Sequence, residues 1–171
     1  MKKRKNTPLV IITLLLLIIT STTSYAYVTW GGGYISKSIP IEDRAIDYPT
    51  TASFNAWNNC GAGVNIYRVP GTGNNWIISM QVADTYAGLY TVITREYLLF
   101  GRATKFRIII NVSVCVNLSN FVKQAVIVHE LGHALCLYDN PPEYPAIMRY
   151  DCVQTWNTPQ QDDINGVLVS Y

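Results

Sequence analysis

The stretch Ala125–Asn140, AVIVHELGHALCLYDN, contains both histidines of the chain. His129 and His133 lie four residues apart, so a helix would place them on one face, about one turn from each other. Two imidazoles at this spacing can hold one Zn²⁺, while Glu130 reaches a water on the metal. The alternative is an amphipathic core helix that happens to carry two histidines. Because both histidines fall inside one H-E-x-x-H pattern, we favour the metal site.

A catalytic zinc site needs a third protein ligand, and no further histidine can supply it. Asp139 follows His133 by six residues, where the helix should have ended and the chain turned back. Glu143 and Asp151 are the other acidic residues nearby in the sequence. Glu143 is flanked by prolines, and Asp151 adjoins Cys152, so both are poorly placed to reach back. We therefore expect Asp139 to be the third ligand.

This pattern resembles a known zinc signature. The letters H-E-L-G-H-A-L-C-L-Y-D resemble the extended signature of the metzincin peptidases, H-E-x-x-H-x-x-G-x-x-H. Cys136 stands at the usual glycine of the turn, where a residue with a Cβ is disfavoured in a left-handed conformation. Asp139 stands at the usual third histidine and is similar to the aspartate of the snapalysin branch. The resemblance implies that the ligand is kept while its type changes.

Two further positions resemble metzincin features. Pro145–Met148 is similar to the tight Met-turn beneath the zinc, with Met148 nine residues after Asp139. The alternative for Met148 is a buried methionine that fills the core. Tyr150 stands where astacin-type and serralysin-type relatives place a tyrosine that can reach zinc. Its alternative is a surface tyrosine, in a chain that has twelve.

The resemblance implies a secreted zinc-dependent metalloendopeptidase. Zinc held by the two histidines and Asp139 would lower the pKa of its water toward about 7. Glu130 would take the water's proton as general base and return it as general acid, and Tyr150 would help to stabilise the oxyanion. A peptide or protein substrate would lie along the edge strand around Gly88–Thr91. No residue pattern indicates calcium.

The first residues have the features of a secretory signal peptide. Met1–Lys5 carries four positive charges, Leu9–Ile19 is apolar except for Thr13, and small residues precede a cleavage site after Ala26. The apolar run is shorter than the roughly 20 residues that span a bilayer, so we favour cleavage over an uncleaved anchor. Loss of the four basic residues changes the formal net charge from +2 to −2. We expect no nucleic-acid partner, no membrane partner after cleavage, and a monomer.

Residues 27–171 are long enough for one domain and too short for two. The four cysteines of a secreted chain favour disulfides, for which three pairings exist. We favour Cys136–Cys152, which would tie the end of the zinc helix to the loop beneath the metal, and Cys60–Cys115 follows by elimination. A zinc site built from cysteines lacks any C-x-x-C pair.

Hydrophobic patterning predicts a small domain of mixed secondary structure. Pro49 at a first turn followed by TASFNAWNNC predicts a helix that buries Phe54 and Trp57, and Ser119 is the expected N-cap of the zinc helix. The closing TPQQDDINGVLVSY resembles the last helix of a small matrixin-like domain. The predicted strands are 34–41, 64–69, 76–83, 88–94 and 106–116. The expected fold is α+β and sandwich-like, a small metzincin-type catalytic domain with a five-stranded mixed, twisted sheet.

Two other interpretations concern the same chain. Trp30–Tyr34, WGGGY, predicts a flexible start of the mature chain in preference to a sugar-stacking platform. A secreted binding or toxin-like module that keeps the fold and the zinc without catalysis is the alternative function. Glu130 argues against it, because a site that only binds zinc needs no general base. A structural zinc domain is disfavoured because closed sites use four protein ligands and only three are found.

Overall fold

A five-stranded mixed sheet forms the centre of the protein. The computed structural model describes residues 27–71, 75–96, 101–151 and 155–171, and the predicted signal peptide 1–26 lies outside these ranges. The strand order is β2-β1-β3-β5-β4. Neighbouring strands are parallel, except that β4 is antiparallel to β5 at the edge. The strands are β1 Ser38–Arg44, β2 Asn65–Arg68, β3 Asn75–Met80, β4 Gly88–Arg95 and β5 Ala103–Asn111.

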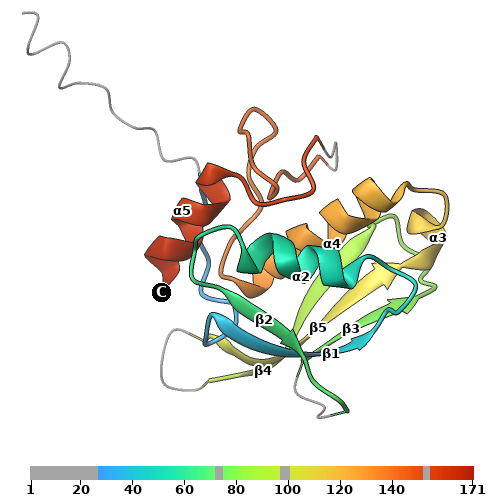
Figure 1. The fold of residues 1–171 in the computed structure, drawn as a ribbon, viewed down its shortest axis with the longest axis horizontal. Coiled ribbons are helices and arrows are strands. Elements are labelled where there is room, and N and C mark those ends of the chain that lie inside the picture. Colours follow the sequence, from blue (N-terminus) through green and yellow to red (C-terminus); the bar gives the residue numbers. More distant parts are fainter. Residues whose placement is uncertain (1–26, 72–74, 97–100, 152–154) are drawn as a thin grey trace, which may run out of the picture.

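Helices cover one face of this sheet. In the described ranges they are α2 Thr50–Asn58, α3 Val112–Cys115, α4 Asn120–Ala134 and α5 Gln161–Ser170. The ribbon shows α2 and α4 beside each other above the sheet, with α5 to one side of them (Figure 1). The expected α+β fold with a five-stranded mixed sheet is therefore confirmed.

The core lies between the sheet and the helices. Alternate residues of the central strands are fully buried, as the period-two pattern of a strand predicts. Trp57 of α2 is also fully buried, and its Nε1 donates a hydrogen bond to the carbonyl of Val128 at 2.9 Å. The predicted burial of Phe54 and Trp57 is confirmed. The fully buried strand residues include Ile39, Ile41, Ile77, Phe106, Ile108 and Ile110.

Several predicted strand boundaries were wrong. The first strand ends at Arg44 rather than Ile41, and the third ends at Met80 rather than Ala83. The first strand begins at Ser38 rather than Tyr34, because Tyr34 forms only an isolated bridge to Ala103. The last predicted strand ends at Asn111, and the apolar residues after it form the short helix α3. Asn111 causes this change: its side chain accepts a hydrogen bond from the amide of Ser113 and caps the helix.

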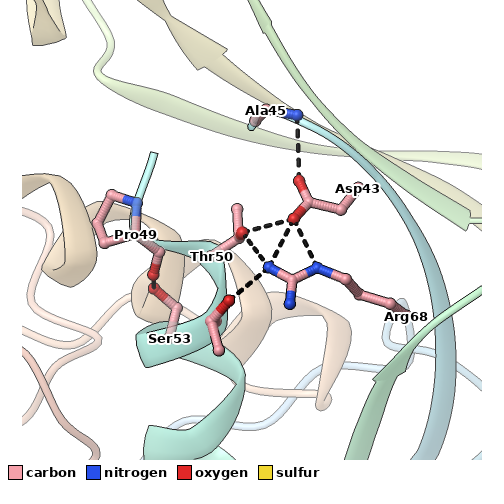
Figure 2. Close-up of polar contacts among 7 residues, drawn as sticks. Asp43, Ala45, Pro49, Thr50, Ser53 and Arg68 are labelled. Atoms are coloured by element: carbon pink, nitrogen blue, oxygen red, sulfur yellow. Dashed lines mark hydrogen bonds and ion pairs between the residues drawn. The ribbon is translucent and has the colours of Figure 1, made fainter. Parts of the chain in front are cut away.

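A polar brace joins β1, α2 and β2. Asp43 accepts hydrogen bonds from the amide of Ala45 at 3.1 Å and from Nε of Arg68 at 2.9 Å. Figure 2 shows the Arg68 guanidinium between Asp43 and the first turn of α2, where it donates to the hydroxyls of Thr50 and Thr51 at 2.7 Å. The side chain of Asp43 is 6 % exposed. The brace therefore fixes the start of α2 on the sheet, on elements that do not contribute to the site described below.

The N-terminal segment 27–34 is docked rather than free. The amide of Trp30 donates to the carbonyl of Cys136 at 2.9 Å, and Thr29 forms a bridge with Leu137. Gly32 and Gly33 are buried, and Tyr34 donates its amide to the carbonyl of Ala134. The expectation of a flexible start was therefore wrong. The glycines permit a close backbone approach, since a Cβ on Gly33 would overlap Cys136.

The free thiols correct the predicted disulfides. Cys60, Cys115 and Cys136 are free, so the pairing Cys60–Cys115 was wrong. Cys115 donates its thiol to the carbonyl of Ala87, whereas Cys60 lies after the end of α2. Cys136 was expected to pair with Cys152, which lies outside the described residues. Its thiol instead faces the hydroxyl of Tyr171, at 3.5 Å.

No helix within residues 27–71, 75–96, 101–151 and 155–171 is long and apolar enough to cross a membrane.

Candidate metal centre

Helix α4 carries the two histidines on one face. Ser119 caps the helix by accepting a hydrogen bond from the amide of Val122, as predicted. The rings of His129 and His133 lie 4.9 Å apart between centroids and stand nearly perpendicular to each other. The spacing of four residues on a helix therefore gives the expected neighbouring imidazoles.

Asp139 joins the two histidines after the chain reverses. Its Oδ1 lies 3.1 Å from Nε2 of His129 and 3.5 Å from Nε2 of His133. The reversal places Cys136 at φ 68°, in the left-handed region expected for this position. The amide of Leu137 then bonds the carbonyl of Gly132 and closes the turn. The carboxylate is thereby brought back over the helix.

Backbone carbonyls orient both imidazoles. Nδ1 of His129 lies 2.9 Å from the carbonyl of Ile147, and Nδ1 of His133 lies 3.0 Å from the carbonyl of Leu137. Because a carbonyl can only accept, each Nδ1 carries a proton, and Nε2 is the ring atom left to bind a metal when the imidazole is neutral. Both Nε2 atoms face the carboxylate of Asp139.

The donor set fits zinc. One ligand atom from each of His129, His133 and Asp139 lies within 4.8 Å of the other two. Two imidazole nitrogens and one carboxylate oxygen are ligands that zinc prefers, and three of them leave a fourth position for water. Glu143 and Asp151 are not part of this cluster. Among the described residues, it is the one group of three or more such side chains that could hold a metal ion.

The cluster strongly shifts the proton affinity of its members. Burial alone lowers the pKa of His129, but its hydrogen bond with Asp139 and the charge of Glu130 outweigh this and raise the pKa to about 9. Burial, followed by the charge on His129, lowers the pKa of His133 to about 4. Burial opposes ionisation of Asp139, yet the hydrogen bond with His129 keeps its pKa below 3.8. A cation that binds Nε2 of His129 must therefore displace a proton.

Glu130 lines the cavity that contains the three candidate ligands, and it is 6 % exposed. Burial raises its pKa from 4.5 to about 7, although the charge of His129 and a hydrogen bond from the backbone of Tyr90 act in the opposite direction. Its side chain occupies the space beside Gly88 at the start of β4. A carboxyl group with a pKa near neutrality can both accept and return a proton.

Aromatic side chains form the walls of the cavity, whose volume is about 340 Å³. The Trp30 indole stands edge-on to His133 and donates from Nε1 to its carbonyl at 3.2 Å. Tyr90 is buried, and its hydroxyl donates to the carbonyl of Gly32 at 3.1 Å. Tyr150 lies at the rim and is 59 % exposed. Its expected role at the metal stays a prediction. The five aromatic residues of the lining are Trp30, Tyr86, Tyr90, Tyr138 and Tyr150.

Met148 and Asp163 connect the loop after Asp139 to helices α4 and α5. Met148 is 1 % exposed and lies against Gly132 of α4, where a Cβ would overlap its sulfur. Asp163 of α5 is fully buried and accepts hydrogen bonds from the amides of Ile147 and Met148. The sequence indicated Met148 near the metal, and its role as a Met-turn stays a prediction, whereas Asp163 was not identified. A carboxylate three residues after Gln160, in a capping box, was the available signal.

Trp30 and Tyr90 were also missed as parts of the site. Tyr90 lies in the strand segment expected to bind substrate, and its inward position follows from the strand alternation. Trp30 gave no comparable signal, because its contacts with His133 span 103 positions of the sequence.

Comparison with known proteins gives a likeness of fold. No family model matches the sequence. No curated protein matches it either. A solved structure described as the "GM1 bound form of the ECX AB5 holotoxin" contains a chain that superposes with a TM-score of 0.57 at 16 % sequence identity. The match covers 85 % of this chain and 86 % of that chain. At this identity, the likeness shows the fold alone.

These comparisons correct the family and the function expected from the zinc signature. The assignment to the metzincin peptidases was wrong, as was the main interpretation as a secreted metalloendopeptidase. The matching structure is described as the GM1 bound form of an AB5 holotoxin, and the description names no peptidase. Eleven positions around H-E-x-x-H, with shorter likenesses at Met148, Tyr150 and the closing segment, carried the assignment, and motifs of that length can recur without the family.

Proposed function

We propose that the protein is a secreted, toxin-like binding module that holds one zinc ion at His129, His133 and Asp139. The observation that carries the proposal is the fold likeness to a chain of an AB5 holotoxin over 85 % of this chain. The converging ligand atoms support the zinc part, because both histidines already present Nε2 toward Asp139. A toxin-like module acts outside the producing cell, which agrees with the signal features of residues 1–26.

The proposal includes partners. The matching structure is an AB5 assembly described as bound to GM1, so we propose partner subunits in place of the expected monomer and a glycolipid-bearing surface as the target. GM1 is the first ligand to test because it is the one named for that assembly. Zinc would support binding by holding the Asp139 loop on α4, next to the aromatic cavity.

A binding experiment on zinc-loaded residues 27–171 tests this function. Zinc content is measured by plasma mass spectrometry, and flotation is compared for phosphatidylcholine vesicles with and without GM1. One zinc per chain and flotation that needs GM1 are expected, and His129→Ala should lose the zinc. If the chain carries no zinc, the zinc part fails. If it also ignores GM1 and forms no oligomer in native mass spectrometry, the binding module fails.

A second candidate function, a zinc-dependent hydrolase, is favoured by Glu130. This carboxyl group is buried beside the ligands, and its pKa of about 7 suits proton transfer. Bound zinc supplies a water of lowered pKa. Glu130 would accept that water's proton and later deliver it to the leaving group, while the backbone of Tyr90 holds the carboxylate in place. A binding module does not need Glu130, so a panel of ester, amide and phosphoester substrates with the variant Glu130→Gln separates the two functions.

A further inference from the structure

One peptide group beneath the metal centre is held at both of its ends. The carbonyl oxygen of Ile147 accepts the hydrogen bond from Nδ1 of His129, at 2.9 Å. The N–H on the other side of the same peptide bond belongs to Met148, and it donates to Oδ1 of Asp163 at 3.3 Å. A continuous hydrogen-bonded path therefore runs from the carboxylate of Asp163 on α5, through the Ile147–Met148 peptide group, to the imidazole of His129 on α4.

Asp163 makes three hydrogen bonds to the backbone. Besides Met148, it accepts from the amides of Ile147 and Gln160, both at 2.8 Å. The side chain is fully buried. No lysine, arginine or histidine of the described residues forms an ion pair with it. Its contacts are thus directed to the loop under the metal and to the start of its own helix.

The two histidines differ in what holds their carbonyl partners. The carbonyl that orients His133 belongs to Leu137, whose amide is bonded to Gly132 of the same helix. His133 is therefore oriented by the end of α4 itself. The carbonyl that orients His129 lies 18 positions downstream, in a loop attached to α5 through Asp163. Other backbone bonds of this loop, from the amide of Asn140 to the carbonyl of Met148 and from the amide of Tyr150 to the carbonyl of Asn140, do not involve the Ile147–Met148 peptide group.

We propose that Asp163 is a positioning residue for His129, acting through the Ile147–Met148 peptide group. The proposal rests on the zinc site of the proposed function. By fixing the carbonyl of Ile147, Asp163 keeps the Nδ1 proton of His129 in place and keeps Nε2 directed at the metal. Hydrogen-bond partners of ligating histidines commonly set their tautomer and orientation, and their loss costs about 10–100-fold in metal affinity.

The variant Asp163→Asn tests the path. An asparagine has the same shape but presents an NH₂ group, so at least one backbone N–H would face a donor instead of an acceptor. The loop should then shift, and the orientation of His129 should relax. We expect zinc affinity, measured by competition with a chromogenic chelator, to fall about 10–100-fold.

Asp43→Asn is the matched control. Asp43 is also a nearly buried carboxylate that accepts from a backbone amide, but it belongs to the brace of β1, α2 and β2 (Figure 2). The variant Asp43→Asn should lower the melting temperature while leaving zinc affinity at the wild-type value. A structural role alone for Asp163 would make the two variants alike.

A second readout follows the Nδ1 proton of His129 by NMR and does not depend on zinc. In the wild type this proton should exchange slowly with water, and at a rate close to that of the Met148 amide. In Asp163→Asn it should exchange at least tenfold faster, while the Nδ1 proton of His133 is unchanged.

The outcomes separate the two proposals. If the wild type binds no zinc, the zinc site is refuted. If its His129 Nδ1 proton is nevertheless protected from exchange, and this protection is lost in Asp163→Asn, the positioning path is supported. Asp163→Asn with wild-type zinc affinity and a wild-type Nδ1 exchange rate overturns the path. If Asp163→Asn does not fold, the exchange rates of the His129 Nδ1 proton and the Met148 amide in the wild type decide whether the path holds. A Met148 amide that exchanges more than tenfold faster than the His129 proton then refutes the link.

Discussion

A Cβ atom on Gly88 would lie 2.6 Å from both Cγ and Oε1 of Glu130. The start of the edge strand β4 thus approaches helix α4 at a point where any side chain would overlap the buried carboxyl group. Gly88→Ala should therefore move Glu130 or push β4 outward, with a loss of about 1–3 kcal/mol in the free energy of unfolding. Urea unfolding and the NMR shift of the Tyr90 amide, which bonds Glu130, measure the two effects.

Gly101→Asn is the control for that substitution. A Cβ at Gly101 would lie at least 3.8 Å from its neighbours, and asparagine tolerates its positive φ of 68°. The expected change is within about 0.5 kcal/mol. Wild-type stability and an unshifted Tyr90 amide in Gly88→Ala would show that the strand does not press on Glu130.

Replacing Glu130 by glutamine separates proton transfer from binding. The amide is nearly isosteric, so Glu130→Gln should keep the fold, the zinc and any GM1 binding. It should lower any hydrolytic turnover by at least about 10² because the amide cannot carry the proton. Zinc content, vesicle flotation and substrate turnover are compared with the wild type. Unchanged turnover in Glu130→Gln would show that Glu130 does not transfer the proton in the reaction.

Removing Asp139 should remove one ligand. Asp139→Ala should weaken zinc binding about 10–100-fold or more, whereas Asp139→His should keep the metal, because imidazole is also a zinc ligand. Glu143→Ala and Asp151→Ala are matched acidic controls outside the cluster, and both should bind zinc like the wild type. The assignment fails if Asp139→Ala binds zinc normally while either control does not.

The carboxyl group of Asp163 should titrate near pH 6. Burial raises its pKa from 3.8 to about 6, despite three backbone hydrogen bonds that act in the opposite direction. Because the folded pKa lies above the unfolded one, the associated stability is complete below about pH 4 and is lost as the pH rises through 6. The loss is about 2–3 kcal/mol. A site-specific ¹³C titration of the carboxyl carbon checks the pKa, and a midpoint below 4 would contradict it.

The thiols should differ in their reactivity. Cys60 is half-buried, whereas Cys115 and Cys136 are buried, and burial raises the pKa of the Cys60 and Cys115 thiols. Iodoacetamide should label Cys60 slowly in the native protein and the other two only after denaturation, without a reductant. Mass mapping locates the labels. A Cys60–Cys115 crosslink in unreduced protein would restore the original pairing.

The local parts of the site could be predicted from the sequence because they depend on short spacings. The helix period places His129 beside His133, and a turn of fixed length brings Asp139 back over them. The left-handed residue at Cys136 follows from the same reversal. In β5, Phe106 and Ile108 are buried on one face of the sheet, whereas Arg107 between them is exposed on the other, as the alternation of a strand requires.

The remaining parts depend on contacts between distant segments. Asp163 reaches the loop beneath the metal because α5 packs there, and no periodic pattern in the sequence encodes this packing. The end of β5 was misjudged because residues 112–116, three of which are valine, favour a strand, while the local cap at Asn111 favours a helix. The family could not be settled by one motif, because function depends on the whole surface around it.

The docking of segment 27–34 has a consequence for the order of folding. Trp30 meets His133 across 103 positions, and Val28 meets Asn140 across 112, so these contacts close some of the longest loops in the chain. Loop closure of this length costs entropy that only a nearly complete core can offset. The segment that leaves the ribosome early must therefore remain undocked until α4 has been made and packed. The wall of the cavity next to His133 is completed last.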